Sequence, residues 1–186
     1  MTTFLVEHAW IPPAALVILV LAGPPLGRWL LGHPTLAWAA FAASSVPLGL
    51  LTLTPVRREL YARCTVEWSA PTPGRVELAA NVVLFVLPVL LAGVALRRPV
   101  VALLAGSAAS ALVEAVQAGV PALGRSCSTN DWLSNTIGAA IGAALASAAL
   151  AWSQQASARA GAGDAAIRSG RARPRPAHPG RRRRSR

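Results

Sequence analysis

The stretch ELAANVVLFVLPVLLAGVAL, residues 77 to 96, decides the fold class. Beyond Glu77 it carries no charge, and its one amide side chain is Asn81. A helix of about 20 mostly apolar residues can cross a bilayer core about 30 Å thick. A helix is expected because lipid cannot satisfy unpaired backbone groups, and the run lacks the alternation typical of barrel strands. The stretch therefore predicts a membrane-spanning helix.

Four further apolar runs of similar length lie on either side of this stretch. They cover approximately 10–31, 35–53, 100–119 and 132–152. The first run contains Pro24 and Pro25, which would kink or end a helix, so this span could be short or bent. We expect an all-α, polytopic transmembrane helix bundle of about five spans, in contact with membrane lipids.

The charged residues are few and are concentrated near the carboxyl end. The 186 residues are 54% hydrophobic and 13% charged, with a net charge of +11. All 18 basic residues are Arg, and ten of them lie between Arg159 and Arg186. Without residues 153–186, which also contain Asp164, the net charge falls to +2. The high pI therefore belongs to a tail, and we expect no nucleic acid as a partner.

Residues 153–186 also decide the expected orientation in the membrane. Their Ala, Gly, Pro, Ser and Arg content predicts a disordered segment, and Arg beside a span favours the cytoplasm and anionic lipid. Five spans place the termini on opposite sides, so we expect the N-terminus outside and the C-terminus in the cytoplasm. Thirteen Arg then lie inside and five outside, but without the tail the count is three against five.

The two cysteines fall in different loops on the same expected face. Cys64 lies between the second and third spans, and Cys127 lies between the fourth and fifth. Two cysteines on an oxidising face can form a disulfide, which would join the two loops. The alternative is two unrelated free thiols, and the shared face favours the disulfide.

Ionisable and amide side chains gather at the same outer ends of the spans. Such side chains are rare inside membrane helices and are often functional. Glu114 and Gln117 are three residues apart and Asp131 and Asn135 are four apart, so each pair shares a helix face. The candidate ligand-binding residues are Asn81, Glu114, Gln117, Arg125, Asp131 and Asn135.

These residues also have purely structural interpretations. Asp131 could only cap the N-terminus of its helix. Glu114 could only form an ion pair with Arg125. Asn81 and Asn135 could only link neighbouring helices by hydrogen bonds. A binding site would need the same scaffold, so these alternatives are compatible with a functional role.

No motif of a known catalytic or metal-binding class is present in the sequence. It contains no CxxC, no HExxH and no phosphate-binding glycine loop, and we expect no cofactor and no metal. Two carboxylates could still act as acid and base or bind a cation through oxygen. Gly138 and Gly142 form a GxxxG motif, which is typical of close helix packing.

Several of these residues occur in an order that resembles the VanZ family. NVVLFV at 81–86 is similar to the family's Asn-apolar-Leu-Phe segment, and EAVQ at 114–117 to its Glu-x-x-Gln. DWLSNTIGA at 131–139 is similar to its Asp-x-x-x-Asn-Thr-x-Gly-Ala. The similar stretch runs from about Val46 to Ala146. It departs from the family at LPVL, residues 87–90, where the family's Gly is missing.

The resemblance implies a bacterial cytoplasmic-membrane protein of the cell envelope. The family is named after an accessory determinant of low-level resistance to teicoplanin, a lipid-bearing glycopeptide. That determinant acts without the precursor remodelling performed by the other proteins of its gene cluster. On this basis we divide the chain into an additional membrane segment at 1–45, a VanZ-like domain at 46–152 and an Arg-rich tail at 153–186.

Two hypotheses from different classes follow. The first is a protein that binds an amphiphilic glycopeptide or lipid-linked envelope ligand at its outer face and contributes to teicoplanin-type resistance. Arg57, Arg58 and Arg125 could meet the ligand's phosphate or carboxylate groups there. The second is an intramembrane enzyme acting on a lipid-linked substrate through Glu114 and Asp131. The sequence shows no nucleophile or metal cluster, which favours the binding protein.

Overall fold

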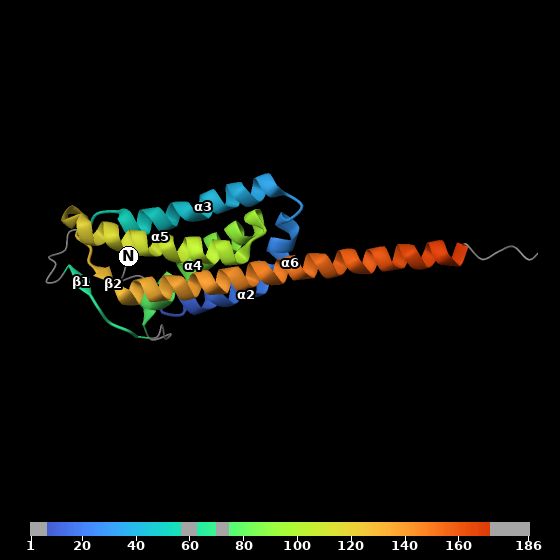
Figure 1. Cartoon of the computed structure of the whole chain (residues 1–186). Coiled ribbons are helices and arrows are strands. Elements are labelled where there is room, and N and C mark those ends of the chain that lie inside the picture. Colours follow the sequence, from blue (N-terminus) through green and yellow to red (C-terminus); the bar gives the residue numbers. More distant parts are fainter. Residues whose placement is uncertain (1–6, 57–62, 70–74, 172–186) are drawn as a thin grey trace, which may run out of the picture. The chain divides into compact units, whose positions relative to one another are not determined.

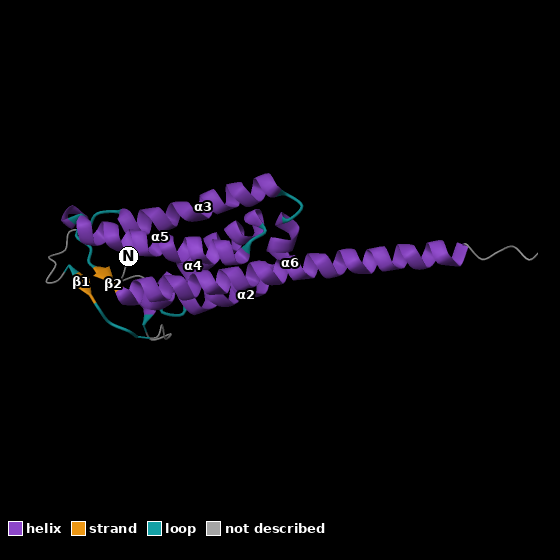
Figure 2. Cartoon of the chain, viewed as in Figure 1, coloured by secondary structure: helices purple, strands orange, loops and turns teal. Residues whose placement is uncertain are grey.

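The chain folds into long helices joined at one end by a small β-ladder (Figures 1 and 2). The computed structural model describes residues 7–56, 63–69 and 75–171. The long helices of these residues are α2 (Ile11–Leu30), α3 (Pro34–Leu53), α4 (Val76–Leu96), α5 (Pro99–Gly119) and α6 (Thr129–Arg171). All five are long and apolar enough to cross a membrane. The predicted bundle of about five transmembrane helices is confirmed.

Proline residues mark the beginning of helices but do not end α2. Pro34 and Pro99 are the first residues of α3 and α5, where a missing N–H group costs nothing. α2 continues through Pro24 and Pro25 and ends at Leu30, so the structure does not shorten the first span. In an apolar environment no water can bind the backbone N–H and C=O groups that a broken helix would expose. The helix therefore keeps its remaining backbone hydrogen bonds.

α4 is the central helix of the bundle. It contacts α2, α3 and α5, and Val86 and Leu90 in its middle are fully buried. The large apolar side chains of α5 instead lie on the outside: Val100, Leu104 and Leu112 are each more than 60% exposed. An exposed apolar surface of this kind fits contact with lipid rather than water. Apolar residues therefore occur both inside and outside the bundle, as its position in a membrane requires.

The backbones of α4 and α6 touch at the GxxxG motif. A Cβ atom on Gly138 would lie 2.1 Å from the carbonyl oxygen of Val82, and one on Gly142 would lie 2.4 Å from that of Val86. No side chain fits at either position, which confirms the predicted close packing. This contact fixes α6, around Gly138 and Gly142, against the first half of α4.

The ladder lies where α3 ends, α4 begins, α5 ends and α6 begins (Figure 1). β1 (Cys64–Thr65) and β2 (Cys127–Ser128) pair in parallel, with Cys64 opposite Cys127. In the structure these two cysteines form a disulfide, with their Cα atoms 4.5 Å apart, and are not free thiols. We call this the ladder end of the bundle.

Two arginines hold the opposite end of the bundle. The guanidinium of Arg97, after α4, donates a hydrogen bond to the carbonyl of Leu31 at 3.2 Å. The guanidinium of Arg28 lies 5.0 Å from the ring centre of Trp152, a cation–π contact between α2 and α6. The ladder end and the arginine-bearing end are therefore different in chemistry.

The structure describes the first part of the expected disordered tail as helix. α6 continues to Arg171, whereas residues 172–186 lie outside the described residues. Six Ala between 153 and 171 have high helix propensity, which outweighs the Gly and Ser that suggested disorder. By its internal contacts Ser153–Arg186 is a unit separate from Met1–Trp152.

Candidate functional site

The first turn of α6 places Asp131, one of the two carboxylates of the candidate site. The hydroxyl of Ser128, directly before α6, accepts a hydrogen bond from the backbone N–H of Asp131 at 3.4 Å. This is the N-cap to N3 geometry, so Ser128 caps the helix. The carboxylate of Asp131 accepts a bond from the Asn81 amide at 2.8 Å. The helix cap is therefore Ser128 and not Asp131, and Asn81 does link two helices.

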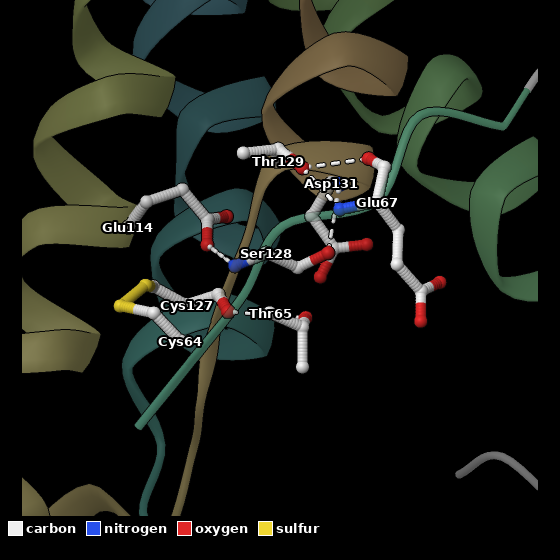
Figure 3. Close-up of a disulfide and its surroundings, with 8 residues drawn as sticks. All are labelled: Cys64, Thr65, Glu67, Glu114, Cys127, Ser128, Thr129 and Asp131. Carbon is white, nitrogen blue, oxygen red and sulfur yellow. Dashed lines mark hydrogen bonds between the residues drawn. A yellow bond between two sulfur atoms is a disulfide. The ribbon is translucent and has the colours of Figure 1, made fainter. Parts of the chain in front are cut away.

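The carboxylate of Glu114 reaches the other side of Ser128 (Figure 3). Its Oε2 atom accepts the backbone N–H of Ser128 at 2.7 Å. Within the part of the chain that the structure describes, its second oxygen has no hydrogen bond and no ion pair joins it to Arg125. The structural interpretation of Glu114 as the partner of Arg125 is therefore wrong. Ser128 binds the Glu114 carboxylate through its backbone N–H and the Asp131 backbone N–H through its hydroxyl, so it links the two residues.

Gln117 and Arg125 are directed toward the end of α3. The Gln117 amide donates to the carbonyl of Thr52 at 2.9 Å, and the Arg125 Nε–H donates to the carbonyl of Thr54 at 3.1 Å. The last carbonyls of a helix have no partner within it, so both side chains satisfy orphan acceptors of α3. Gln117 is buried. Both residues hold the end of α3.

Asn135 lies deeper, between α5 and α6. Its amide donates to the hydroxyl of Ser110 at 2.9 Å, and the hydroxyls of Thr136 and Ser107 meet at 2.9 Å one helical turn away along α5. The side-chain amide oxygen of Asn135 and the hydroxyl of Ser134 are buried without a hydrogen-bond partner among the described residues. Asn135 therefore links two helices, as its structural interpretation proposed.

The segment from residue 63 to residue 69 crosses the ladder end and is fixed to the start of α6. We call it the cover segment. The Thr129 hydroxyl accepts the backbone N–H of Glu67 at 2.9 Å and donates to its carbonyl at 2.6 Å. The Asn130 side chain accepts the backbone N–H of Ser69 at 2.7 Å. With the disulfide, these bonds fix the cover segment at both of its ends.

An open pocket lies beneath the cover segment, beside Glu114. Its volume is about 330 Å³, and it is lined by Trp68, Ala111, Glu114, Cys127, Ser128, Thr129 and Trp132. The rings of Trp68 and Trp132 are 6.4 Å apart and nearly perpendicular. The indole N–H of Trp132 donates to the carbonyl of Ser107 at 3.3 Å, which fixes that ring. We call this the Trp–Glu pocket.

The structure thus divides the six candidate residues by location. Only Glu114 lines the Trp–Glu pocket, and Asp131 with Asn81 lies beside it, across Ser128. Gln117 and Arg125 hold α3, and Asn135 links α6 to α5, as described above. The sequence did not point to Trp68, because only the fold of the long loop after α3 brings it there. The one sequence signal was Cys64, four residues earlier, whose disulfide fixes this loop.

A comparison with family models bears on this arrangement. The model described as VanZ/LLP1 matches residues 30–151, well over half of the chain. The chain belongs to the VanZ/LLP1 family. No curated protein and no solved structure matches it.

The VanZ/LLP1 region includes every candidate residue and both cysteines. It begins at residue 30, earlier than the similar stretch from Val46, so α3 lies within it while nearly all of α2 lies outside. As a VanZ/LLP1 protein with five apolar helices, the chain is a multi-pass membrane protein. Its helices contact lipid, and the cover segment belongs to the same region as the helices beneath it.

The described residues contain no group of three or more His, Cys, Asp or Glu side chains able to hold a metal ion. Among the described membrane-spanning helices, the acidic residues at the ladder end are Glu77 in α4, Glu114 in α5 and Asp131 in α6, and of these only Glu114 lines the pocket. What the VanZ/LLP1 site offers a ligand is therefore one available carboxylate oxygen, two indole rings and an open entrance.

Proposed function

We propose that this VanZ/LLP1 protein binds an amphiphilic glycopeptide or lipid-linked envelope ligand at the outer face of the bacterial cytoplasmic membrane. Through this binding it contributes to teicoplanin-type resistance. The observation that carries the proposal is the Trp–Glu pocket, an open hollow of about 330 Å³ with a carboxylate and two indole rings. Few precisely placed polar groups on an otherwise apolar wall are typical of small-molecule sites.

The position of the pocket suits an amphiphile. Glu114 lies near the end of the membrane-spanning helix α5, which ends at Gly119. A ligand bound here would keep its polar part beneath the cover segment and its apolar part along the exposed side chains of α5, such as Leu112. Tryptophan is also favoured at this depth, since its ring is apolar and its N–H is polar.

Two features support placing the ladder end outside the cell. The ten Arg between Arg159 and Arg186 follow the last span and favour a cytoplasmic C-terminus. The Cys64–Cys127 disulfide lies at the ladder end, and disulfides persist on the oxidising side of the membrane. Since α6 begins at the ladder end and continues into the tail, both features give the same orientation.

Teicoplanin susceptibility in a sensitive bacterial host tests this function. The host carries the wild-type chain, the Glu114→Gln variant or the Glu7→Gln control, which changes an exposed acid outside α2–α6. The amount of each protein in the membrane fraction is matched. We expect resistance from the wild type and the control, and its loss with Glu114→Gln. Equal resistance for all three, or none from the wild type, would contradict the proposal.

A second candidate function is an intramembrane enzyme acting on a lipid-linked envelope substrate. It is favoured by one observation, that Ser128 contacts both Glu114 and Asp131 (Figure 3). Two carboxylates on either side of a bound substrate could act as general acid and base. Purified protein should then release product from a lipid-linked precursor, and both Glu114→Gln and Asp131→Asn should abolish the release. Absence of turnover by the wild type would eliminate this candidate.

A further inference from the structure

Among the described residues that line the Trp–Glu pocket, Glu114 is the only charged one, and its charge is negative. Arg57 and Arg58 lie outside the described residues. The Arg125 Nε–H at the same end of the bundle is bound to the carbonyl of Thr54 and does not line the pocket. An anionic group would be repelled by the carboxylate, and an uncharged apolar group would bury it without compensation. The pocket therefore selects for a cation.

The carboxylate is oriented for a further bond. Its Oε2 atom accepts the backbone N–H of Ser128, which holds the group in place. The other oxygen has no hydrogen-bond partner in the described part of the chain. A carboxylate that is held by one backbone bond can accept a strong, charge-assisted bond from an incoming N–H donor or attract a quaternary ammonium.

The two tryptophans provide the walls that an organic cation prefers. Their rings are 6.4 Å apart at 83°, so they form a corner instead of a stack. A cation within about 6 Å of a ring centre is attracted by the negative face of the ring, most strongly for tryptophan. Hydrated metal ions gain little from such walls, whereas alkylammonium groups fit them. Carboxylate and rings together favour an organic ammonium over an inorganic ion.

We propose that the Trp–Glu pocket binds an organic ammonium group of the envelope ligand, between the Glu114 carboxylate and the Trp68 and Trp132 rings. This inference rests on the proposed function and names the chemical class that the outer face recognises. The ammonium group could belong to a zwitterionic lipid headgroup or to an amine of a glycopeptide. Both sources offer the same chemistry to the pocket.

Calorimetric titration of the full-length protein with choline tests the inference. The protein is held in nanodiscs made only of phosphatidylglycerol, and 3,3-dimethyl-1-butanol serves as a probe of the same shape without the charge. We expect saturable binding of choline and none of the alcohol. Glu114→Gln should weaken choline binding by about tenfold, which corresponds to about 1.4 kcal/mol.

Matched variants separate the pocket from general effects on folding. Trp68→Leu should weaken choline binding, whereas Trp10→Leu should leave it unchanged, because only Trp68 lines the pocket. Trp10 is the matched control because the two side chains are exposed to almost the same degree, 65% for Trp68 and 66% for Trp10. Trp68→Phe should restore part of the affinity, since it retains a ring. Equal binding of choline and the alcohol, or an unchanged affinity in both Glu114→Gln and Trp68→Leu, would overturn the inference.

Competition identifies the source of the ammonium group. If it is a lipid headgroup, choline binding should weaken in nanodiscs that contain phosphatidylethanolamine. If it is a glycopeptide amine, teicoplanin should displace choline in phosphatidylglycerol nanodiscs, and its N-acetylated form should not. Choline binding without any effect of Glu114→Gln on resistance would refute the proposed function alone. Resistance that depends on Glu114 without choline binding would refute the ammonium inference alone.

Discussion

At the scale of single residues, nearly every polar side chain near the ladder end has a defined partner. Gln117 and Arg125 bind the end of α3, Asn135 binds Ser110, and Asn81 binds Asp131. Glu114 differs because its carboxylate, which has one oxygen without a hydrogen-bond partner among the described residues, lines an open pocket. The division separates residues that hold the scaffold from the one that faces a ligand.

The Asn81–Asp131 hydrogen bond leads to a prediction about stability. Asn81→Ala removes the hydrogen bond between α4 and α6 and leaves the half-buried Asp131 carboxylate without this donor. We therefore expect the free energy of unfolding to fall by about 0.5 to 2 kcal/mol. Unfolding of the purified protein in mild detergent measures the loss. Ser45→Ala is the matched control, because the Ser45 hydroxyl bonds only within α3, to the carbonyl of Phe41. Equal stability of the two variants would contradict this role of Asn81.

At the scale of elements, the GxxxG contact fixes the position of α6. Gly138→Ala would place a Cβ atom 2.1 Å from the Val82 carbonyl oxygen, so α4 and α6 must separate. We expect a loss of about 1 to 3 kcal/mol, typical of overpacking. Gly49→Ala is the control, because a Cβ atom there meets nothing within 4 Å. Thermal unfolding in detergent should show a lower Tm for the first variant only; a lower Tm for both, or for neither, would contradict this account of the contact.

The disulfide gives a second prediction at this scale. It closes a loop of 63 residues, so in the chain-entropy model its reduction removes up to about 4 kcal/mol of stability. It also frees one end of the cover segment that carries Trp68. We therefore expect both a lower Tm and weaker choline binding after reduction, and the same from Cys64→Ser. Unchanged choline binding with a lowered Tm would show that the cover segment does not form the pocket.

The elements also show what the sequence could and could not predict. The span predicted at 77–96 coincides almost exactly with α4, Val76–Leu96, because the length of an apolar run is set by the thickness of the bilayer. The end of α6 was not predictable in this way. Outside the membrane span the length of a helix depends on the helix propensity of its residues, which is a weak signal. Trp68 lies in a loop with no periodicity, so its position depends on contacts with residues some 60 positions away.

At the scale of the whole molecule, the proposed orientation depends on the tail. Outside the tail, three Arg belong to the expected inner side and five to the expected outer side, so among the charges only residues 153–186 favour a cytoplasmic C-terminus. We expect deletion of these residues to produce a mixed orientation. In intact cells treated with an impermeant reductant, an impermeant maleimide should label Cys64 and Cys127 fully in the wild type and less in the deletion variant. Labelling only after lysis of the wild type would contradict the orientation.

The central claim of the account is that the ladder end binds an envelope amphiphile through the Trp–Glu pocket. Direct binding of teicoplanin to the purified full-length protein in nanodiscs tests it, with wild type compared against Glu114→Gln. The account predicts saturable binding to the wild type, weakened by about tenfold in the variant, a difference of about 1.4 kcal/mol. Binding that is absent in the wild type, or equal in both proteins, would contradict it.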